Sequence, residues 1–506
     1  MFSFSSFVPV PARTRWVLAL ACLVHFAMGA LVGLSVDEAH YALYAAHPAL
    51  SYFDHPPLVG WLQWPLVALD APTAVLRLLP QALWLGTALL VFQLAQRLQA
   101  LGGQADMPGQ GAAGHWAVVA LALAPLLHVL GLGLLPDTLL MFLTAALMWW
   151  TLDLMQPGRG QLLALWASLG VLLGLAGLSK YTAIVPALAV AWCVLRAHGL
   201  RVLACAGPWL AVGVAVLLVL PVAVWNSQND WVSFAYQAQH GAGGDWSGKH
   251  VARFVLLQVL VYGPLFMWGG GGLARMGAQP ARALGWFFVL PMAVFTVASG
   301  GGTSLPHWTA PAWVALAPFA GMALAQSVQR GRRRWVVGLA WAQGALCVGM
   351  LGLMLSAGWP FVSGSHGQGN SQSPSNPLAD VYGWDAAGQS ARALAAQHGL
   401  TSVAVQNWTL ASRIGWYARP LPVHVLEDRF DQFDLWAGDL PVGADTLLVD
   451  WSQLAYTVPQ APHGFAHCEF LQAQDVRRLG STIATFRFYA CRRWSGSPQP
   501  QLQGSP

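Results

Sequence analysis

Two clusters of acidic and polar residues follow the first long apolar run of the sequence. The run extends from Trp16 to Gly33, about the length that crosses a bilayer, and Asp37 and Glu38 come soon after it. The second cluster is Asp54-His55-Pro56-Pro57. Carboxylates beside a transmembrane helix are costly to bury and usually serve chemistry or ion binding. We therefore interpret the loop from Leu34 to Trp64 as the floor of an active site at the membrane surface.

These acidic residues fit more than one role. As a general base, Asp37 would take a proton from a reacting hydroxyl group. Alternatively, an Asp at the start of an interfacial helix, with Glu38 in the first turn, caps and stabilises that helix. Asp54 is a suitable hard oxygen ligand for a divalent metal, or it belongs to a polar turn before the two prolines.

The loop resembles the first extracytoplasmic loop of the bacterial lipid-linked-sugar glycosyltransferases of the GT-C type. This family includes the protein O-mannosyltransferases and the transferases of aminoarabinose to lipid A. Its pattern is an Asp-Glu pair, a Tyr, and an aromatic-acid-base-Pro-Pro motif, which Asp37-Glu38, Tyr41 and Phe53–Pro57 match here. The resemblance implies that Asp37 is the catalytic acid-base residue, with Glu38 in support and Tyr41 in the sugar or acceptor site.

The same resemblance implies roles for four further polar residues. Asp54 would bind a divalent metal, and His55, which replaces the usual lysine, would contact the donor phosphate when protonated or act as a metal ligand. Lys180 matches a Gly-Leu-x-x-Leu-x-Lys motif and would bind the phosphate of the lipid donor; the alternative is a lysine that snorkels along lipid. Asp137 is either a site acid or a helix cap.

Two outer clusters suit sugar recognition, because aromatic rings cover the apolar face of a sugar and amides bind its hydroxyls. The first is the stretch 225–240, which fits an interfacial helix equally well, and the second is a His-Trp pair before Pro311. The candidate residues for contact with the sugar or acceptor are Asn226, Asp230, His240, His307 and Trp308.

The composition is that of a membrane protein. The chain has 506 residues, of which 56% are hydrophobic and 9% charged, whereas soluble domains have about 25% charged residues. Apolar runs predict an all-α bundle of about eleven transmembrane helices, with interfacial helices in the first outer loop. With the N-terminus inside, most basic residues fall in inner loops, as the positive-inside rule requires. The chain lacks a phosphate-binding loop, so a nucleotide cofactor or donor is not expected.

The composition changes near residue 356. Residues 1–356 are predicted to form the transmembrane catalytic domain, 357–377 a Gly/Ser/Pro linker, 378–494 a small extracytoplasmic α/β domain, and 495–506 a disordered tail. Strands are expected at 403–406, 422–426, 446–450 and 485–492, with helices at 384–398 and 409–417. Cys468 and Cys491 either pair in this domain or remain free thiols.

The sequence thus predicts an inverting glycosyltransferase of the bacterial cytoplasmic membrane. It would move a monosaccharide from a polyprenyl-phosphate donor to a protein, lipid A or another glycan on the outer face, and it would not bind nucleic acid. A transporter or flippase is the main alternative, since acids and broken helices suit it as well. A non-catalytic scaffold that binds glycan is the third, but it leaves Asp37, Asp54 and Lys180 unexplained.

Overall fold

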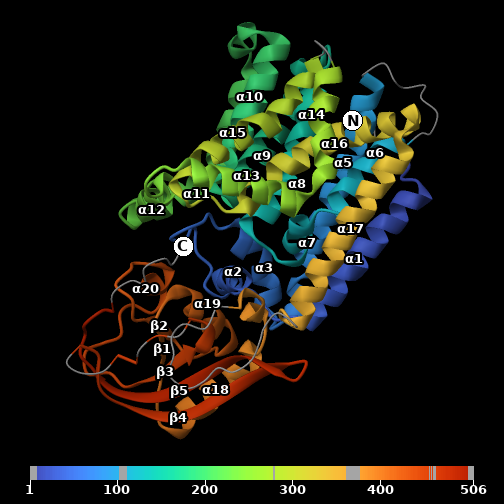
Figure 1. Cartoon of the computed structure of the whole chain (residues 1–506). Helices are drawn as coiled ribbons and strands as arrows, with labels where there is room; N and C mark the ends of the chain where they lie inside the picture. The colour runs from blue at the N-terminus through green and yellow to red at the C-terminus, as the bar shows by residue number, and fades with distance from the viewer. Residues whose placement is uncertain are drawn as a thin grey trace. The chain divides into compact units, whose positions relative to one another are not determined.

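The computed structural model describes residues 8–101, 111–276, 280–359, 376–454, 456, 458–459 and 463–499. The chain forms two compact units (Figure 1). The helical unit comprises Met1–Met28, Ala49–Leu62 and Ala74–Val348, and the C-terminal unit comprises Gly29–Pro48, Gln63–Thr73 and Gly349–Pro506. Most of the predicted linker, residues 360–375, lies outside the described residues.

The helical unit is built from long apolar helices. Their bounds are α1 Ala12–Leu31, α5 Leu78–Leu101, α6 Ala112–Ala122, α7 Pro125–Leu132, α8 Pro136–Leu154, α9 Leu163–Ser179, α10 Ile184–His198, α11 Ala206–Gln228, α12 Val232–Ala242, α13 Gly248–Tyr262, α14 Trp268–Arg275, α15 Trp286–Ala298, α16 Ala310–Ser327 and α17 Arg333–Ser356. Helices α3 (Leu58–Ala68) and α4 (Thr73–Leu76) lie in the first loop, before α5.

Each predicted apolar run corresponds to a helix or to a bent pair of helices. Within the described residues, 7 segments are long and apolar enough to cross a membrane, or up to 9 if each bent pair is one span. The predicted number is higher for two reasons. One counted segment, Pro306–Ser356, contains both α16 and α17, which are separated by non-helical backbone at Arg330 and Gly331. Helix α9 has 17 residues and falls just below the length of a full span.

Glycines allow close packing between α9 and α11. A Cβ atom at Gly170 would lie 2.5 Å from the carbonyl oxygen of Ala211, and one at Gly174 would lie 2.7 Å from the side chain of Leu218. Small residues four apart on a membrane helix let a neighbouring backbone approach in this way. Helices α9 and α11 therefore form a tightly packed pair. Lys180 directly follows the last residue of α9.

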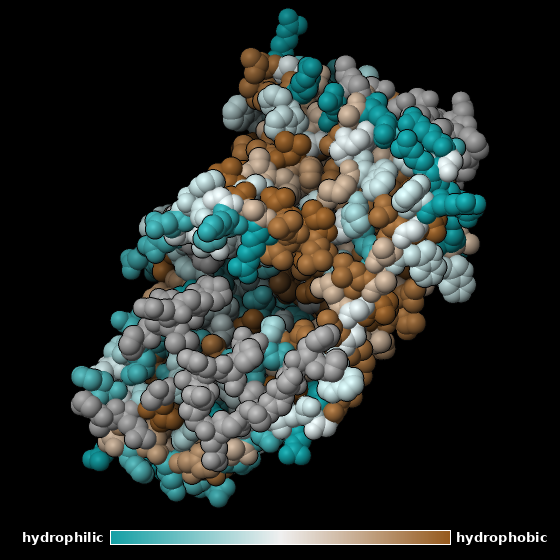
Figure 2. Space-filling view, viewed as in Figure 1, coloured by the Kyte–Doolittle hydropathy of each residue, from teal (hydrophilic) through white to brown (hydrophobic). Residues whose placement is uncertain are grey.

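The helical unit exposes large apolar side chains in the way a membrane protein does. Figure 2 shows a broad area of them on this unit, and Trp209, Val216 and Leu217 of α11 are among those exposed. Monomeric soluble proteins rarely expose continuous apolar patches of this kind. The chain is therefore a multi-pass membrane protein.

Charged residues from two of the predicted inner loops and their flanks contact each other in the helical unit. Arg97 at the end of α5 and Arg159 after α8 both pair with Asp153, and the Arg97 guanidinium also lies over the ring of Trp149. The topology predicted from charge places all three charged residues on the same side of the membrane. Their contact agrees with the predicted topology, which places these chain segments on the same side.

The C-terminal unit combines α2 (Val36–Ala46) with the last third of the chain. Its five-stranded sheet has the order β2-β1-β3-β5-β4. Strands β1 (Val403–Val405), β2 (Val423–Val425) and β3 (Thr446–Trp451) are parallel, and β5 (Ser481–Trp494) runs antiparallel to β3 and to β4 (Phe465–Arg478). Helices α18 (Trp384–Gln397), α19 (Trp408–Tyr417) and α20 (Gln432–Trp436) complete the unit, and Figure 1 shows α2 beside α19.

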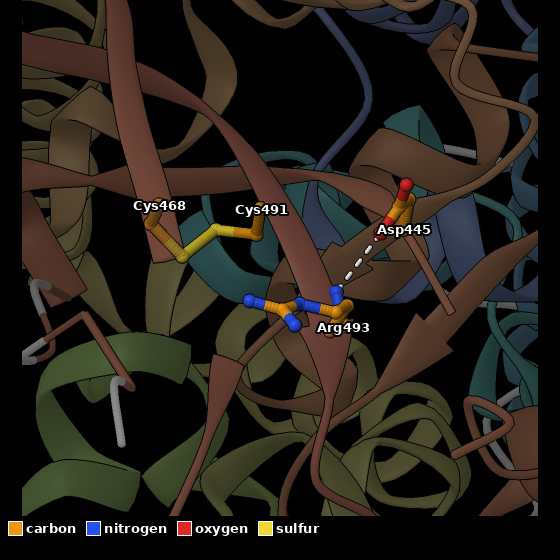
Figure 3. Close-up of a disulfide and its surroundings, with 4 residues drawn as sticks. All are labelled: Asp445, Cys468, Cys491 and Arg493. Carbon is orange, nitrogen blue, oxygen red and sulfur yellow. Dashed lines mark hydrogen bonds between the residues drawn. A yellow bond between two sulfur atoms is a disulfide. The ribbon is translucent and has the colours of Figure 1, made fainter. Parts of the chain in front are cut away.

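Cys468 and Cys491 form a disulfide between β4 and β5 (Figure 3). The two residues face each other in the register of the antiparallel pair, and both belong to a core with Phe465, Leu448 and Trp494. Beside the disulfide, the backbone N–H of Arg493 donates to the Asp445 carboxylate at 2.9 Å. The pairing of the two cysteines, which the sequence left open, is thus present.

The structure differs from the predicted C-terminal region at two points. Strand β4 was not predicted, because its sequence alternates poorly and most of its side chains are at least partly exposed, as is usual at a sheet edge. The predicted tail begins too early: the backbone of Gln499 bonds Leu426 and Asp428, in the segment that follows β2. The remaining tail, 500–506, lies outside the described residues.

Candidate active site

Glu38 caps helix α2. The Glu38 carboxylate accepts hydrogen bonds from the backbone N–H and the hydroxyl of Ser35 at 3.0 Å each, and the Ser35 hydroxyl accepts from the Glu38 N–H. This reciprocal arrangement is a capping box, which satisfies N–H groups that a helix start leaves unpaired. The structure thus shows the capping role for Glu38, and its predicted support of Asp37 stays a prediction.

Asp37 lies in the same first turn but is not part of the capping box. Within the C-terminal unit its carboxylate interacts electrostatically with the buried guanidinium of Arg413. Burial lowers the pKa of Arg413, and the charge of Asp37 raises it. Arg413 also pairs with Asp380 and lies over the ring of Trp384 at 4.0 Å. The start of a helix and a nearby cation both favour a negative charge at this position.

The next turn of α2 packs into the C-terminal unit. His40 hydrogen-bonds the Ser412 hydroxyl of α19 at 3.1 Å and contacts the rings of Tyr41, Tyr44 and Trp408. Tyr41 is buried and packs in this cluster; its predicted place in the sugar or acceptor site stays a prediction. This packing holds α2 against α19 within the C-terminal unit.

Asp431 places a titratable group beside this packed face. It caps α20 and is almost fully buried. Burial raises its pKa to about 7; Asp434 raises the pKa further, whereas the backbone N–H of Phe433, His40 and Arg429 lower it. In the unfolded chain an aspartate loses its proton near pH 4. Between about pH 4 and pH 7 the folded state therefore binds more protons, and its stability falls as the pH rises.

Replacement of Asp431 by asparagine should remove this pH dependence while keeping the cap, because Asn caps helices as well as Asp does. The wild-type chain should lose about 2–4 kcal/mol of unfolding free energy between about pH 4 and pH 8 through this group, and D431N should not. Thermal unfolding of the purified full-length protein at both pH values measures the difference. D475N, at a half-exposed aspartate of β4, is the control; equal pH dependence in D431N and wild type would contradict the prediction.

In the helical unit, Lys180 and Asp137 form a buried ion pair. Asp137 lies in the first turn of α8 and Lys180 follows the last residue of α9, where helix dipoles favour an acid and a base respectively. The Lys180 ammonium donates to both carboxylate oxygens at 2.7 Å, and the side chains are 7% and 3% exposed. Lys180 thus does not snorkel along lipid. Since an ammonium has three N–H groups, one is left for a ligand.

Further basic and aromatic groups surround this pair. His307 approaches the Asp137 carboxylate at 3.8 Å, and the Lys180 ammonium lies 5.6 Å from the ring of Trp308. His55 is also within electrostatic range of Asp137. The structure therefore brings together five predicted site residues of the helical unit, one acid and three basic groups with an aromatic ring. With one carboxylate and up to three positive charges, this cluster suits an anion.

Helix α12 holds the loop that carries Asp54 and His55. The amide of Gln237 donates to the carbonyl of Asp54 at 2.6 Å, and the Ser233 hydroxyl donates to the carbonyl of Tyr52 at 2.9 Å. The Asp54 carboxylate and the His55 ring nitrogen are 3.1 Å apart, so the two side chains form a hydrogen-bonded pair. Ser233 and Gln237 were not among the predicted residues, although both lie in the polar stretch 225–240.

Three residues of that stretch, Asn226, Asp230 and His240, were predicted to contact the sugar. Asn226 is fully buried; its amide donates to the carbonyl of Val222 and its oxygen accepts from the N–H of Ser233. The amide N–H thus bonds within α11, and the amide oxygen connects α11 to α12; the predicted sugar contact of Asn226 stays a prediction. Asp230 is exposed in a turn with positive φ. The side chain of His240 lies outside the described residues.

A metal site at Asp54 has few protein donors. Among the described residues, histidine, cysteine, aspartate and glutamate form no group of three that could hold a metal ion, and Asp54 pairs with His55. This pair does not fit a metal bound by protein ligands alone. The divalent ion expected from the resemblance stays a prediction, and no catalytic step below depends on it.

Comparisons with known proteins agree with this fold. The model of the dolichyl-phosphate-mannose-protein mannosyltransferase family matches residues 54–225. The lipid A galacturonosyltransferase RgtD of Rhizobium johnstonii is 25% identical over 291 residues, which cover 55% of this chain and 58% of that protein. The chain thus matches less than two thirds of the length of this relative.

Two solved structures have the same fold over almost the whole chain. ArnT from Cupriavidus metallidurans in the apo state aligns with a TM-score of 0.60 and 19% identity, covering 94% of this chain and 98% of that one. The same protein bound to undecaprenyl phosphate aligns with a TM-score of 0.59 and 18% identity, over 94% and 97%. The chain therefore has the GT-C-type fold, and its predicted resemblance to the lipid-linked-sugar glycosyltransferases is confirmed.

Proposed function

We propose that this protein transfers a monosaccharide from a polyprenyl-phosphate donor to a hydroxyl group of an envelope glycolipid. The observation that carries the proposal is the buried Lys180–Asp137 pair with His307, Trp308 and His55 around it. A buried lysine beside imidazoles and an aromatic ring favours an anion such as the donor phosphate. The named relatives support the donor and acceptor, since one acts on lipid A and the other was solved with undecaprenyl phosphate.

The reaction forms one glycosidic bond and breaks one. The acceptor oxygen attacks the anomeric carbon from the face opposite the phosphate, so the configuration inverts. The bond between that carbon and the phosphate oxygen breaks, the hydroxyl proton passes to the Asp37 carboxylate, and polyprenyl phosphate leaves as an anion. Because the leaving group is already an anion, it requires charge neutralisation and no general acid; Lys180 and His55 supply that charge.

The proposed location is the outer face of the bacterial cytoplasmic membrane, with the N-terminus inside. The distribution of basic residues supports this orientation. The Cys468–Cys491 disulfide supports an extracytoplasmic C-terminal unit, because disulfides persist in oxidising compartments.

A deletion strain tests the function in the cell. Mass spectrometry of its envelope should show glycolipids that lack one monosaccharide, with the sugar restored by wild-type protein and not by D37N. Unchanged glycolipids together with a lost protein modification would overturn the proposed acceptor. Retained modification of every glycolipid and glycoprotein, with a slower supply of lipid-linked sugar, would favour the transporter alternative.

A further inference from the structure

The C-terminal unit contains a pocket outside the cluster around Lys180. Its volume is about 510 Å³, within the range of small-molecule sites. The end of α2, helix α3, the α19–β2 loop and α20 line it, and its polar and aromatic residues are His47, Trp64, Arg419, Phe433 and Trp436. We call it the α2–α20 pocket. The end of α2 lines this pocket, and the first turn of α2 carries Asp37. A molecule bound in the pocket would therefore contact the same helix as the proposed base.

Aromatic rings form the walls of the α2–α20 pocket. Trp436 stacks on His47 with ring centroids 4.9 Å apart and an interplanar angle of 28°, and Trp64 is 51% exposed. Large rings with one open face cover the apolar face of a sugar, and neighbouring polar groups then select its hydroxyls. Burial and the charge of Arg419 lower the pKa of His47, so His47 is neutral at pH 7 and can both donate and accept a hydrogen bond.

Arg419 gives the pocket its charge. Its guanidinium lies 3.6 Å from the centre of the Trp416 ring, and its Nε donates to the Trp416 carbonyl at 3.1 Å. These two contacts hold the guanidinium in place and leave its two terminal nitrogens for an acceptor. Of the described residues, those that line the pocket include no aspartate or glutamate; Asp70 interacts with Arg419 electrostatically but is not part of the lining. An anionic group is therefore favoured over a neutral or cationic one.

We propose that the α2–α20 pocket binds a sugar that carries an anionic group, either a phosphate or a carboxylate. The ring would lie against Trp436 or Trp64, and the anion would accept hydrogen bonds from the terminal nitrogens of Arg419. Both a free sugar phosphate and the headgroup of a glycolipid combine a sugar ring with an anionic group and therefore fit this pocket. That the bound sugar belongs to the acceptor rests on the proposed function.

Binding without any donor tests the pocket independently of sugar transfer. Full-length protein in detergent is titrated with glucose 6-phosphate, with galacturonic acid and with neutral glucose, and binding is measured by calorimetry. The two anionic sugars should bind and glucose should bind at least about tenfold more weakly, the scale of one charge-assisted hydrogen bond. R419Q should lose this preference, whereas R477Q, at a 72% exposed arginine of β4, should keep it.

A second variant and a competitor complete the test. W436L should weaken all three sugars, and the thermal unfolding of each variant shows whether it is folded. Lipid A in the same detergent should compete if a glycolipid headgroup is the occupant, and a lack of competition identifies the free sugar phosphate. Equal binding of glucose and the anionic sugars, or R419Q binding like R477Q, would overturn the proposal. Binding with no transfer activity would uphold the pocket and refute the proposed function.

Discussion

Replacement of Asp37 by asparagine is expected to lower turnover at least about a hundredfold, because removal of a general base typically costs about 10²–10⁴ in rate. The side chain keeps its shape, and the capping box of α2 is made by Ser35 and Glu38, so the helix should remain. Affinity for the lipid donor should stay close to that of the wild type. Single-turnover measurements with purified D37N, together with donor binding, separate the two quantities.

Glu38 provides the matched control for this experiment. A glutamine there still accepts the hydrogen bonds from Ser35, since Gln also serves in capping boxes, so E38Q should keep most of the activity. E38A should instead lower stability by about 0.5–2 kcal/mol, the cost of losing a helix cap. If D37N kept more than about half of the activity on a hydroxyl acceptor, the general-base role would be refuted.

Removal of the Lys180 ammonium is expected to weaken donor binding by about 1.5–3 kcal/mol, the scale of a charge-assisted hydrogen bond. The structure shows why the single variant K180M is not sufficient. It would leave the Asp137 carboxylate buried without its partner, and breaking one side of a buried ion pair costs about 3–5 kcal/mol of stability. A loss of binding could then arise from a loss of folding.

The double variant D137N/K180M resolves this problem. It removes both charges, and the neutral pair should restore much of the stability that K180M loses. Donor binding should nevertheless stay as weak as in K180M, because the cation that faces the phosphate is still missing. Thermal unfolding and equilibrium binding of the lipid donor measure the two effects. Recovery of donor affinity in the double variant would show that Lys180 stabilises the fold and does not contact the phosphate.

The sequence predicted the elements whose signal is local. Long apolar runs identify the membrane helices, and alternating or buried runs in the last third of the chain identify β1, β2, β3, β5, α18 and α19. Strand β4 escaped prediction because an edge strand with polar residues on both faces has no clear period. The sequence did not decide whether Cys468 and Cys491 pair, because their pairing depends on the register of β4 against β5, which no local pattern reveals.

The candidate site was predictable in residue type but less so in role. Asp137 and Lys180 were each identified as site residues, yet their pairing across 43 positions follows only from the packing of α8 against α9. The amide of Asn226 looked suited to a sugar, although it bonds the helix backbone. Arg413 and Ser233, which support α2 and the Asp54 loop, carry no motif of their own and emerge only from the three-dimensional contacts.

Release of polyprenyl phosphate by the purified protein is the most direct measurement of the central claim. The full-length protein is incubated with a polyprenyl-phosphate monosaccharide and lipid A. The lipid products are then separated, identified and quantified by mass spectrometry. We expect equal amounts of polyprenyl phosphate and glycosylated acceptor from the wild type, and at least about a hundredfold slower formation by D37N. Transfer from a nucleotide sugar without any lipid donor, or no release of polyprenyl phosphate with any acceptor, would contradict the account.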